Sequence, residues 1–270
     1  MFSYIFKTKI LLINYFMNKM KTLITLTLVC FFAMHVDAQV KKPVVKKTTT
    51  TKTTVKKTTT TKTKTIKPVA KTPEVKIPGT RVKITTDSGV MIIRLYDKTP
   101  QHRDNFIKLA NEHFFDSLLF HRVIQGFMIQ GGDPQSKYAP PGQQLGMGDV
   151  GYTIPAEFDA SLFHKKGALA AARTPNPAKA SSGCQFYIVQ GSPVPDQQLT
   201  MFEMQKGIKY TPEQRKIYTT IGGTPFLDQD YTVFGEVESG LEVIDKIASV
   251  PKLPGDRPIG DVRMKIEVIK

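Results

Sequence analysis

Phe120-His121-Arg122-Val123-Ile124-Gln125-Gly126-Phe127-Met128-Ile129-Gln130-Gly131-Gly132-Asp133 is the stretch that decides the fold of this chain. It contains two short apolar runs separated by Gln125-Gly126, and each run is typical of a β-strand. Side chains two apart on a strand point the same way. Arg122 therefore lies on one strand, and Met128 and Gln130 share a face of the next. A cation beside an apolar floor favours binding of an apolar group that carries a polar amide.

The net charge is unevenly distributed along the sequence. The chain of 270 residues carries a formal charge of +15. Residues 1–38 hold four Lys and one Asp, residues 39–78 hold twelve Lys and one Glu, and residues 79–270 hold 22 Lys and Arg against 21 Asp and Glu. The basic character therefore belongs to the N-terminal part, and it indicates no nucleic-acid partner for the remainder.

Residues 1–38 have the pattern of a signal peptide. Lys19 and Lys21 precede an apolar run over residues 23–34, and residues 36–38 offer a cleavage site. The run is shorter than the roughly 20 apolar residues that span a membrane. An uncleaved anchor is the alternative. We expect an exported protein; a periplasmic or envelope-associated location in a Gram-negative bacterium follows only from the family resemblance described below.

The chain has two cysteines, Cys30 and Cys184. Cys30 lies inside the apolar run and leaves with a cleaved signal, so Cys184 would remain alone. A single cysteine excludes an internal disulfide. Met1, Met17 and Met20 are all candidate starts, and the sequence does not choose among them.

Residues 39–78 are of low complexity. Thirteen Thr and twelve Lys in this segment leave too few apolar residues for a core, which predicts a disordered linker. Two roles stay open for it. It is either a spacer or a segment that makes weak electrostatic contact with anionic envelope polymers.

Residues 79–270 have the pattern of a globular, mainly β domain. Alternating runs at 82–86 and 90–96 flank Asp87-Ser88-Gly89, which predicts a hairpin. Helices are expected from Pro100 and from Gly240 onward. Further strands are expected at residues 120–124, 127–130, 168–172, 185–190, 231–237 and 264–269. Many short strands with two separated helices predict a closed antiparallel barrel capped by two α-helices.

Residues 192–225 interrupt this pattern. A connection of this length is usually functional or has secondary structure of its own. Thr211-Pro212-Glu213-Gln214 is a capping box with proline at the first helical position, and Gly222-Gly223 follows as a helix end. We therefore expect an extra helical insertion.

Four separated motifs of the chain resemble the cyclophilins, a family of peptidyl-prolyl cis–trans isomerases, and occur in the family's order. They are FHRVIQGFMIQGGDP (120–134), GALAAAR (167–173), SSGCQFYIV (181–189) and FLDQDYTVFGEV (226–237). The resemblance covers about residues 80–270. It implies eight strands in the closed barrel and an isomerase domain at 79–270, interrupted by the insertion.

The activity that the resemblance implies is acceleration of rotation about X-Pro bonds in folding exported proteins. The amide barrier is about 18–20 kcal/mol because resonance ties the nitrogen to its carbonyl. No bond is made or broken, so the reaction needs no cofactor or metal. It needs groups that favour the twisted amide, in which the nitrogen becomes a hydrogen-bond acceptor. A guanidinium is a suitable donor, and the resemblance assigns this catalytic role to Arg122. An ordinary ion-paired surface arginine is the alternative.

The resemblance also implies the residues that contact the substrate. They are Phe127, Met128, Gln130, Ala172, Arg173, Gln185, Tyr187, Phe226, Leu227 and Tyr231. Ala172 and Arg173 match positions whose backbone pairs with the bound peptide as an added strand. Core packing is the competing role for the apolar members, and a structural hydrogen bond is the competing role for Gln130.

Several positions depart from the family's pattern. Tyr187, Phe226 and Tyr231 stand where many members have Phe, Trp and His. The tyrosine hydroxyl at 187 needs a hydrogen-bond partner or water. Loss of the indole N–H at 226 puts tight cyclosporin binding in doubt. The insertion is a further departure, and we expect it to shape which peptides enter the site.

Two other functions stay open. A proline-binding chaperone or assembly module with little turnover would share the fold, because fold does not fix function. A tethering protein that acts through the Lys/Thr-rich segment is the other. The expected partners of the domain at 79–270 are proline-containing polypeptides, no nucleic-acid partner is expected, and a monomer is expected. The histidines lack metal-ligand spacing, so no metal site is predicted.

Overall fold

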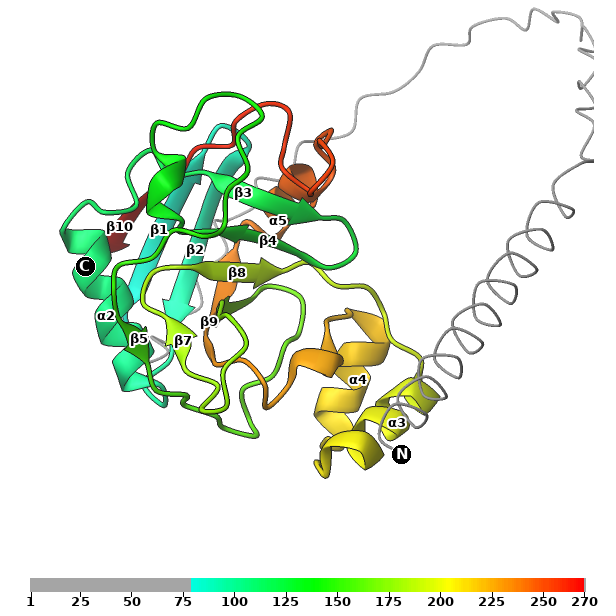
Figure 1. Ribbon diagram of the computed structural model, residues 1–270. Helices are drawn as coiled ribbons and strands as arrows, with labels where there is room; N and C mark the ends of the chain where they lie inside the picture. The colour runs from blue at the N-terminus through cyan, green and yellow to red at the C-terminus, as the bar shows by residue number, and fades with distance from the viewer. Residues whose placement is uncertain (1–78, 270) are drawn as a thin grey trace, which may run out of the picture. The chain divides into compact units, whose positions relative to one another are not determined.

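The computed structural model describes residues 79–269, which contain an eight-stranded antiparallel sheet with four α-helices around it (Figure 1). The strand order is β10-β1-β2-β9-β6-β8-β4-β3. The bounds are Arg81–Thr86 (β1), Gly89–Leu95 (β2), Phe120–Ile124 (β3), Met128–Gly131 (β4), Ala168–Ala171 (β6), Phe186–Val189 (β8), Val233–Ser239 (β9) and Lys265–Ile269 (β10). A two-stranded sheet pairs β5 (Thr153–Ile154) with β7 (Ser181–Ser182). The predicted signal peptide (1–38) and linker (39–78) lie outside the described residues.

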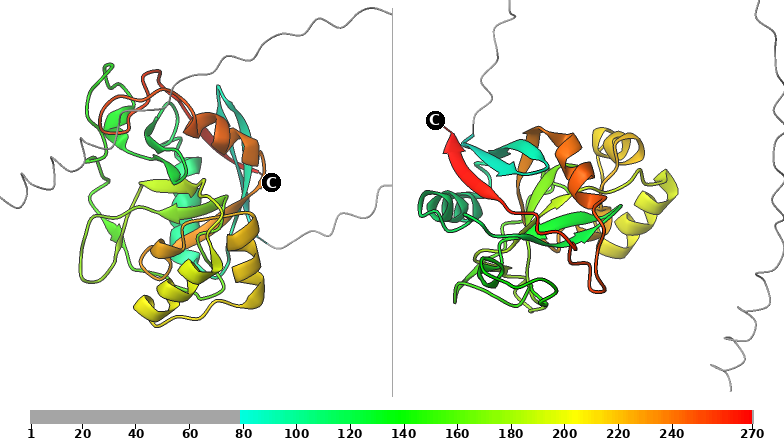
Figure 2. Two further views of the ribbon diagram at one scale, coloured as in Figure 1. Left: turned by 90° about the vertical axis from the view of Figure 1, so that its right-hand side faces the viewer. Right: turned by 90° about the horizontal axis from the view of Figure 1, so that it is seen from above.

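The sheet curls around its interior (Figure 2), and β10 and β3 are its terminal strands. An isolated bridge between Leu119 and Arg263 links the chain beside these two strands, and the Phe120 N–H donates to Val262 O at 2.9 Å. Within residues 79–269 no continuous ladder joins β10 to β3. The predicted eight-stranded antiparallel architecture is thus confirmed as a half-barrel, and complete closure stays a prediction.

The core follows from the alternation of side chains along the strands. Val123 of β3 pairs with Ile129 of β4, which pairs with Ile188 of β8, which pairs with Leu169 of β6. All four side chains are fully buried on the inner face. Because one residue in two points inward, the residues between them must point to the outer face of the same strands.

Two helices cover the half-barrel on different sides (Figures 1 and 2). Helix α2 (Pro100–Asn111) begins with the predicted proline, packs against β9 and β10, and buries Phe106 and Leu109. Helix α5 (Leu241–Ala248) packs against β2, β3 and β4. Both helices were predicted. No helix within residues 79–269 is long and apolar enough to cross a membrane.

The Gly-Gly-Asp end of the opening motif has a structural role. Gly132 has φ +91°, and a Cβ at this position would lie 2.2 Å from the Cys184 carbonyl oxygen. Asp133 caps the short 3-10 helix η1 (Pro134–Ser136) by accepting a hydrogen bond from Gln135 N at 2.7 Å. The motif therefore contains residues that shape the end of β4 as well as residues whose side chains lie on the outer face of the sheet.

The insertion forms a separate helical lobe beside the sheet, shown at the lower right of Figure 1. It contains α3 (Asp196–Lys206) and α4 (Pro212–Thr220). The predicted capping box is present, since the Thr211 hydroxyl accepts from Gln214 N and the Gln214 side chain accepts from Thr211 N. Helix α3 was missed because it starts without a side-chain cap and buries few residues of its own.

The two ends of the lobe meet beside the end of β8. Ser192 and Gly223 form an isolated bridge, and a Cβ on Gly191 would lie 2.5 Å from the Gly223 Cα. Glycine is therefore required where the outgoing and returning chains touch. The short 3-10 helix η2 (Pro225–Leu227) follows at once and leads to β9. This junction of the outgoing and returning chains places the lobe next to the end of β8.

Candidate active site

A row of side chains crosses the outer face of four strands. Arg122 of β3 pairs with Gln130 of β4, which pairs with Tyr187 of β8, which pairs with Ala170 of β6. Met128 lies two residues from Gln130 on the same strand and shares its face. The register thus confirms that Arg122, Met128 and Gln130 gather on one surface.

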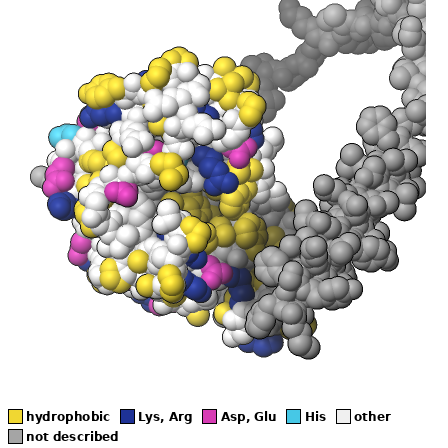
Figure 3. Space-filling view, in the orientation of Figure 1, with side chains coloured by type: hydrophobic (Ala, Val, Ile, Leu, Met, Phe, Trp, Pro, Cys, Tyr) yellow, Lys and Arg dark blue, Asp and Glu magenta, His cyan; other side chains and the backbone are white. Residues whose placement is uncertain are grey.

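A pocket of about 160 Å³ lies on this surface. It is lined by Arg122, Phe127, Met128, Gln130, Ala172, Arg173, Tyr187, Leu227 and Tyr231. Every lining residue was a predicted site residue; of the predicted set, Gln185 and Phe226 lie outside this lining. Figure 3 shows apolar side chains gathered in a hollow beside the helical lobe, with basic side chains at its borders.

Arg122 combines a fixed position with free hydrogen-bond donors. Its side chain is 44% exposed, and its Nη1 donates to Gln130 Oε1 at 3.3 Å. Asp256 lies 3.9 Å from Nε, and both side chains are well exposed. Such an ion pair contributes little. Most of the five guanidinium N–H donors are therefore not used by the hydrogen bonds of the described residues, and they are available to a bound peptide.

Gln130 accepts a hydrogen bond from the Arg122 guanidinium, and Gln185 in turn holds Gln130. Gln185 Nε2 donates to the carbonyl oxygens of Gly146 and Gly148 at 3.0 and 2.7 Å. Because carbonyls only accept, the amide oxygen of Gln185 must face the other way, where it accepts from Gln130 Nε2 at 3.1 Å. This leaves the Gln130 oxygen pointing to Arg122. Backbone carbonyls therefore fix the orientation of the whole chain of contacts.

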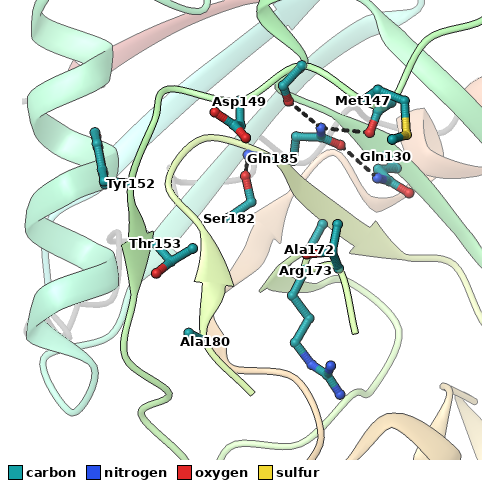
Figure 4. Close-up of a pocket in the computed structure, with 13 residues that line it drawn as sticks. Gln130, Met147, Asp149, Tyr152, Thr153, Ala172, Arg173, Ala180, Ser182 and Gln185 are labelled. Atoms are coloured by element: carbon teal, nitrogen blue, oxygen red, sulfur yellow. Dashed lines mark hydrogen bonds between the residues drawn. The ribbon is translucent and has the colours of Figure 1, made fainter. Parts of the chain in front are cut away.

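Gln185 lies in a second pocket of about 140 Å³, next to the first (Figure 4). The lining residues are Gln130, Gly146, Met147, Gly148, Asp149, Tyr152, Thr153, Ala172, Arg173, Thr174, Ala180, Ser182 and Gln185. Gln130, Ala172 and Arg173 belong to both pockets. The segment that follows β6 therefore separates two neighbouring hollows.

The backbone of that segment is partly occupied. The Ala172 N–H donates to Gln185 O at 2.9 Å, and the Ala172 carbonyl accepts from Ser182 N at 2.8 Å. The single N–H proton of Ala172 is thus already used, but its carbonyl oxygen keeps a second lone pair, and pairing of both residues with a peptide stays a prediction. The backbone N–H and C=O of Arg173 take part in none of the hydrogen bonds of the described region.

Aromatic rings form the rim of the first pocket on the side of the lobe. The rings of Phe127 and Phe226 lie 5.6 Å apart, and Phe226 lies 6.4 Å from Phe202 of α3. Phe226 is 45% exposed, so it is a rim residue and not part of the floor. Sequence reasoning did not include Phe202, because its place in the lobe depends on the missed helix α3.

A second cation faces the pocket from the opposite side. The Arg173 guanidinium lies 4.6 Å above the ring of Tyr231, and its Nε donates to Asp230 O at 2.9 Å. The Tyr231 ring makes an edge contact with Tyr187 at 6.0 Å. Tyr231 therefore contacts both Arg173 and Tyr187. Many family members have a histidine at this position.

The hydroxyl of Tyr187 has a buried partner that the sequence did not reveal. His164 Nε2 lies 2.9 Å from this hydroxyl, and His164 Nδ1 lies 2.7 Å from Asp228 Oδ1. Burial raises the pKa of Tyr187 well above its ordinary value, so the phenol stays protonated. The only signal in the sequence was the tyrosine itself, which requires a partner. Among residues 79–269 no cluster of three or more His, Cys, Asp or Glu could hold a metal ion.

Comparisons with known proteins agree with this geometry. Residues 81–268 match the family described as "Cyclophilin type peptidyl-prolyl cis-trans isomerase/CLD". A protein of Staphylococcus saprophyticus described as a peptidyl-prolyl cis–trans isomerase is 34% identical over 199 residues, which cover 71% of this chain and 94% of that protein. A protein of Staphylococcus aureus with the same description is 36% identical over 187 residues, covering 67% and 87%.

Two further similarities are more limited. A bifunctional phosphatase and peptidyl-prolyl cis–trans isomerase of Streptococcus pyogenes is 38% identical over 187 residues, but the match spans only 37% of that protein. A cyclophilin-type isomerase of Cryptosporidium parvum, crystallised in the presence of the dipeptide Ala-Pro, superposes with a TM-score of 0.51 at 22% identity. That match covers 70% of this chain and 99% of that one, and it shows the shared fold. With the family pattern spanning residues 81–268, the chain belongs to the cyclophilin-type peptidyl-prolyl cis–trans isomerases.

Proposed function

We propose that isomerisation takes place in the 160 Å³ pocket, with the proline ring on the apolar floor and Arg122 at the amide nitrogen. The observation that carries this proposal is the position of a cation with free donors at the edge of a floor made by Met128 and Tyr187. The ring would be held while the carbonyl side of the bond turns. Arg122 would then donate to the nitrogen lone pair that appears only in the twisted amide.

The size of this effect follows from the charge of the donor. Hydrogen bonds to charged groups contribute about 1.5–3 kcal/mol. A contribution of this size in the twisted state alone corresponds to a rate factor of about 10–150. Gln130 supports the donor by accepting one of its N–H groups, so the guanidinium does not need to reorganise during the rotation.

We infer that the substrate is an extended segment that lies over Arg173 and spans both pockets. The free backbone groups of Arg173 support pairing with a peptide strand. A proline in the first pocket would place a neighbouring side chain over the second, which Gln130, Ala172 and Arg173 share. The substrates are then proline-containing polypeptides in open, unfolded or folding states.

The proposal of a groove with two pockets is tested by filling the pockets one at a time. Ala172 lines both pockets, so Ala172→Trp adds a large ring at the wall that they share. We expect a clear loss of kcat/KM on a short X-Pro peptide. Ala180→Trp changes the second pocket only. It should alter the preference for the residue beside proline and preserve turnover of a peptide with alanine there. Unchanged kcat/KM for Ala172→Trp would place the reaction elsewhere.

We also propose that the enzyme is exported and acts on folding proteins of the periplasm or envelope. Support comes from the signal pattern of residues 1–38 and from the Lys/Thr-rich composition of residues 39–78. The second segment would hold the catalytic domain at a distance from the envelope or bind it to anionic polymers there. Detection of the protein in the periplasmic fraction of its host tests the location.

A further inference from the structure

A buried carboxylate joins the helical lobe to the floor of the pocket. Asp228 Oδ1 accepts from the backbone N and from Nδ1 of His164, at 2.8 and 2.7 Å. Its Oδ2 accepts from the hydroxyls of Tyr218 and Tyr210, at 2.6 and 3.0 Å. Tyr218 belongs to α4, and Tyr210 precedes that helix in the lobe. The other end of the network is Tyr187, which lines the pocket.

The direction of each hydrogen bond follows from the donor supply. A carboxylate has about four acceptor sites, and four donors occupy those of Asp228. Burial raises the pKa values of Tyr210 and Tyr218 above their ordinary range, so both keep their protons and donate. When Nδ1 of a neutral imidazole carries the proton, Nε2 can only accept. With that tautomer, the Tyr187 hydroxyl is the donor to His164 Nε2.

The network holds the Tyr187 ring of the floor at its hydroxyl end. The Tyr187 ring is nearly parallel to His164, at 12° with centroids 6.0 Å apart, and its hydroxyl is held by that same ring. A phenylalanine at this position would pack equally well but would have no polar link to the lobe. Loss of one hydroxyl at the lobe end would leave the buried carboxylate short of a donor, which is costly. The His164 imidazole and the Tyr187 ring would then shift.

The lobe holds the adjacent loop as well. Lys206 of α3 donates to the Asp228 carbonyl oxygen at 3.0 Å and pairs with the Asp230 carboxylate. The Asp230 carbonyl in turn accepts from Arg173, the second cation of the pocket. Both routes run from the lobe to residues that line the first pocket, and neither requires the lobe to touch the peptide.

We propose that Tyr210 and Tyr218 are positioning residues for the proline pocket and act on Tyr187 through Asp228 and His164. This inference rests on the pocket assignment proposed above. The lobe thus has a role beyond peptide selection, because it completes the polar network under the catalytic floor. The tyrosine at position 187 is then the residue that connects the insertion to the active site.

A double-mutant cycle tests the proposal. Tyr218→Phe removes one donor to Asp228 and should lower kcat/KM on a short X-Pro peptide about three- to tenfold. Tyr187→Phe should lower it by a similar factor. In the Tyr187→Phe background, Tyr218→Phe should cause no further loss of kcat/KM, although it should lower Tm in both backgrounds. Tyr138→Phe, a change at an exposed position, is the matched control and should alter neither quantity.

The cycle distinguishes positioning from stability. Equal losses of kcat/KM in the two backgrounds, or a lower Tm with unchanged kcat/KM in the wild-type background, would overturn the proposal. Tyr210→Phe serves as a second variant if Tyr218→Phe does not fold. Its hydroxyl is shared with the Pro225 carbonyl, so its effect should be smaller. Failure of the pocket assignment itself would appear separately, as unchanged kcat/KM for Ala172→Trp.

Discussion

At the scale of single residues, those that line the pocket and those that support Tyr187 differ in how far apart they lie in the chain. Arg122, Met128 and Gln130 lie in one continuous motif, so strand alternation alone places them together. The support of Tyr187 was not predictable in the same way, because His164 and Asp228 are 64 residues apart in the chain. Only the folded sheet brings their loops side by side.

His121, the neighbour of Arg122 in β3, gives a pH-dependent stability at the same scale. Burial lowers its pKa from 6.5 to about 4, although Asp133 acts in the opposite direction. The unfolded chain therefore binds the proton more tightly, and stability falls as the pH drops from about 6.5 towards 4. Between pH 7 and 4.5 the free energy of unfolding should fall by about 2–3 kcal/mol more in the wild type than in His121→Gln.

Urea unfolding at the two pH values measures this difference. His113→Gln is the matched control, since it removes an imidazole whose side chain is exposed. If His121→Gln and the wild type lose the same free energy over this pH range, the buried imidazole does not titrate as described.

At the scale of elements, local signals determined which parts were foreseeable. Helix α4 has a complete capping box within four residues, and the sequence predicted it. Helix α3 has no such signal and was missed, and with it the contact of Phe202 with the rim. Strand β9 begins at Val233, two residues later than expected, because the preceding residues form the loop beside the pocket.

Phe202 extends the aromatic rim away from the pocket and should contribute to peptide selection. Phe202→Ala should lower kcat/KM about two- to tenfold for peptides with phenylalanine beside proline, which is the range expected for one aromatic pair. Peptides with alanine at that position should be turned over as before. Met204→Ala, at an exposed position on the same helix, is the control. An equal loss for both peptides would indicate a structural role only.

Deletion of the whole lobe is a poor test of selectivity. The sequence led to the expectation that the insertion shapes which peptides enter the site. The lobe, however, supplies two of the four donors to Asp228. Its removal would leave a buried carboxylate with unfilled acceptor sites under the pocket. Single substitutions on the rim and in the network separate the two roles.

At the scale of the whole molecule, charge and catalysis are assigned to different segments. Residues 39–78 carry twelve Lys, whereas residues 79–270 are nearly neutral. A chain that starts at residue 79 should therefore keep the kcat/KM of the full protein on a short peptide. It should lose binding to dextran sulfate, a soluble polyanion, that the full protein shows at low salt and loses at about 1 M salt, where screening is strong.

The outcome of that comparison also decides between the two roles of the linker. Binding of dextran sulfate by the full protein alone would support electrostatic contact with the envelope. Absence of binding by the full protein would leave the spacer role. Equal binding by both chains would contradict the assignment of the basic surface to residues 39–78.

Hydrogen bonding of Arg122 to the twisted amide is the central claim, and steady-state kinetics of Arg122→Ala on a short X-Pro peptide tests it most directly. Peptide affinity, measured separately by titration, should change little, because the nitrogen accepts only in the twisted state. The value of kcat should fall about 10- to 150-fold, while Arg103→Ala, which removes an arginine of α2 outside the pocket, should have no effect. A wild-type kcat for Arg122→Ala would contradict the account.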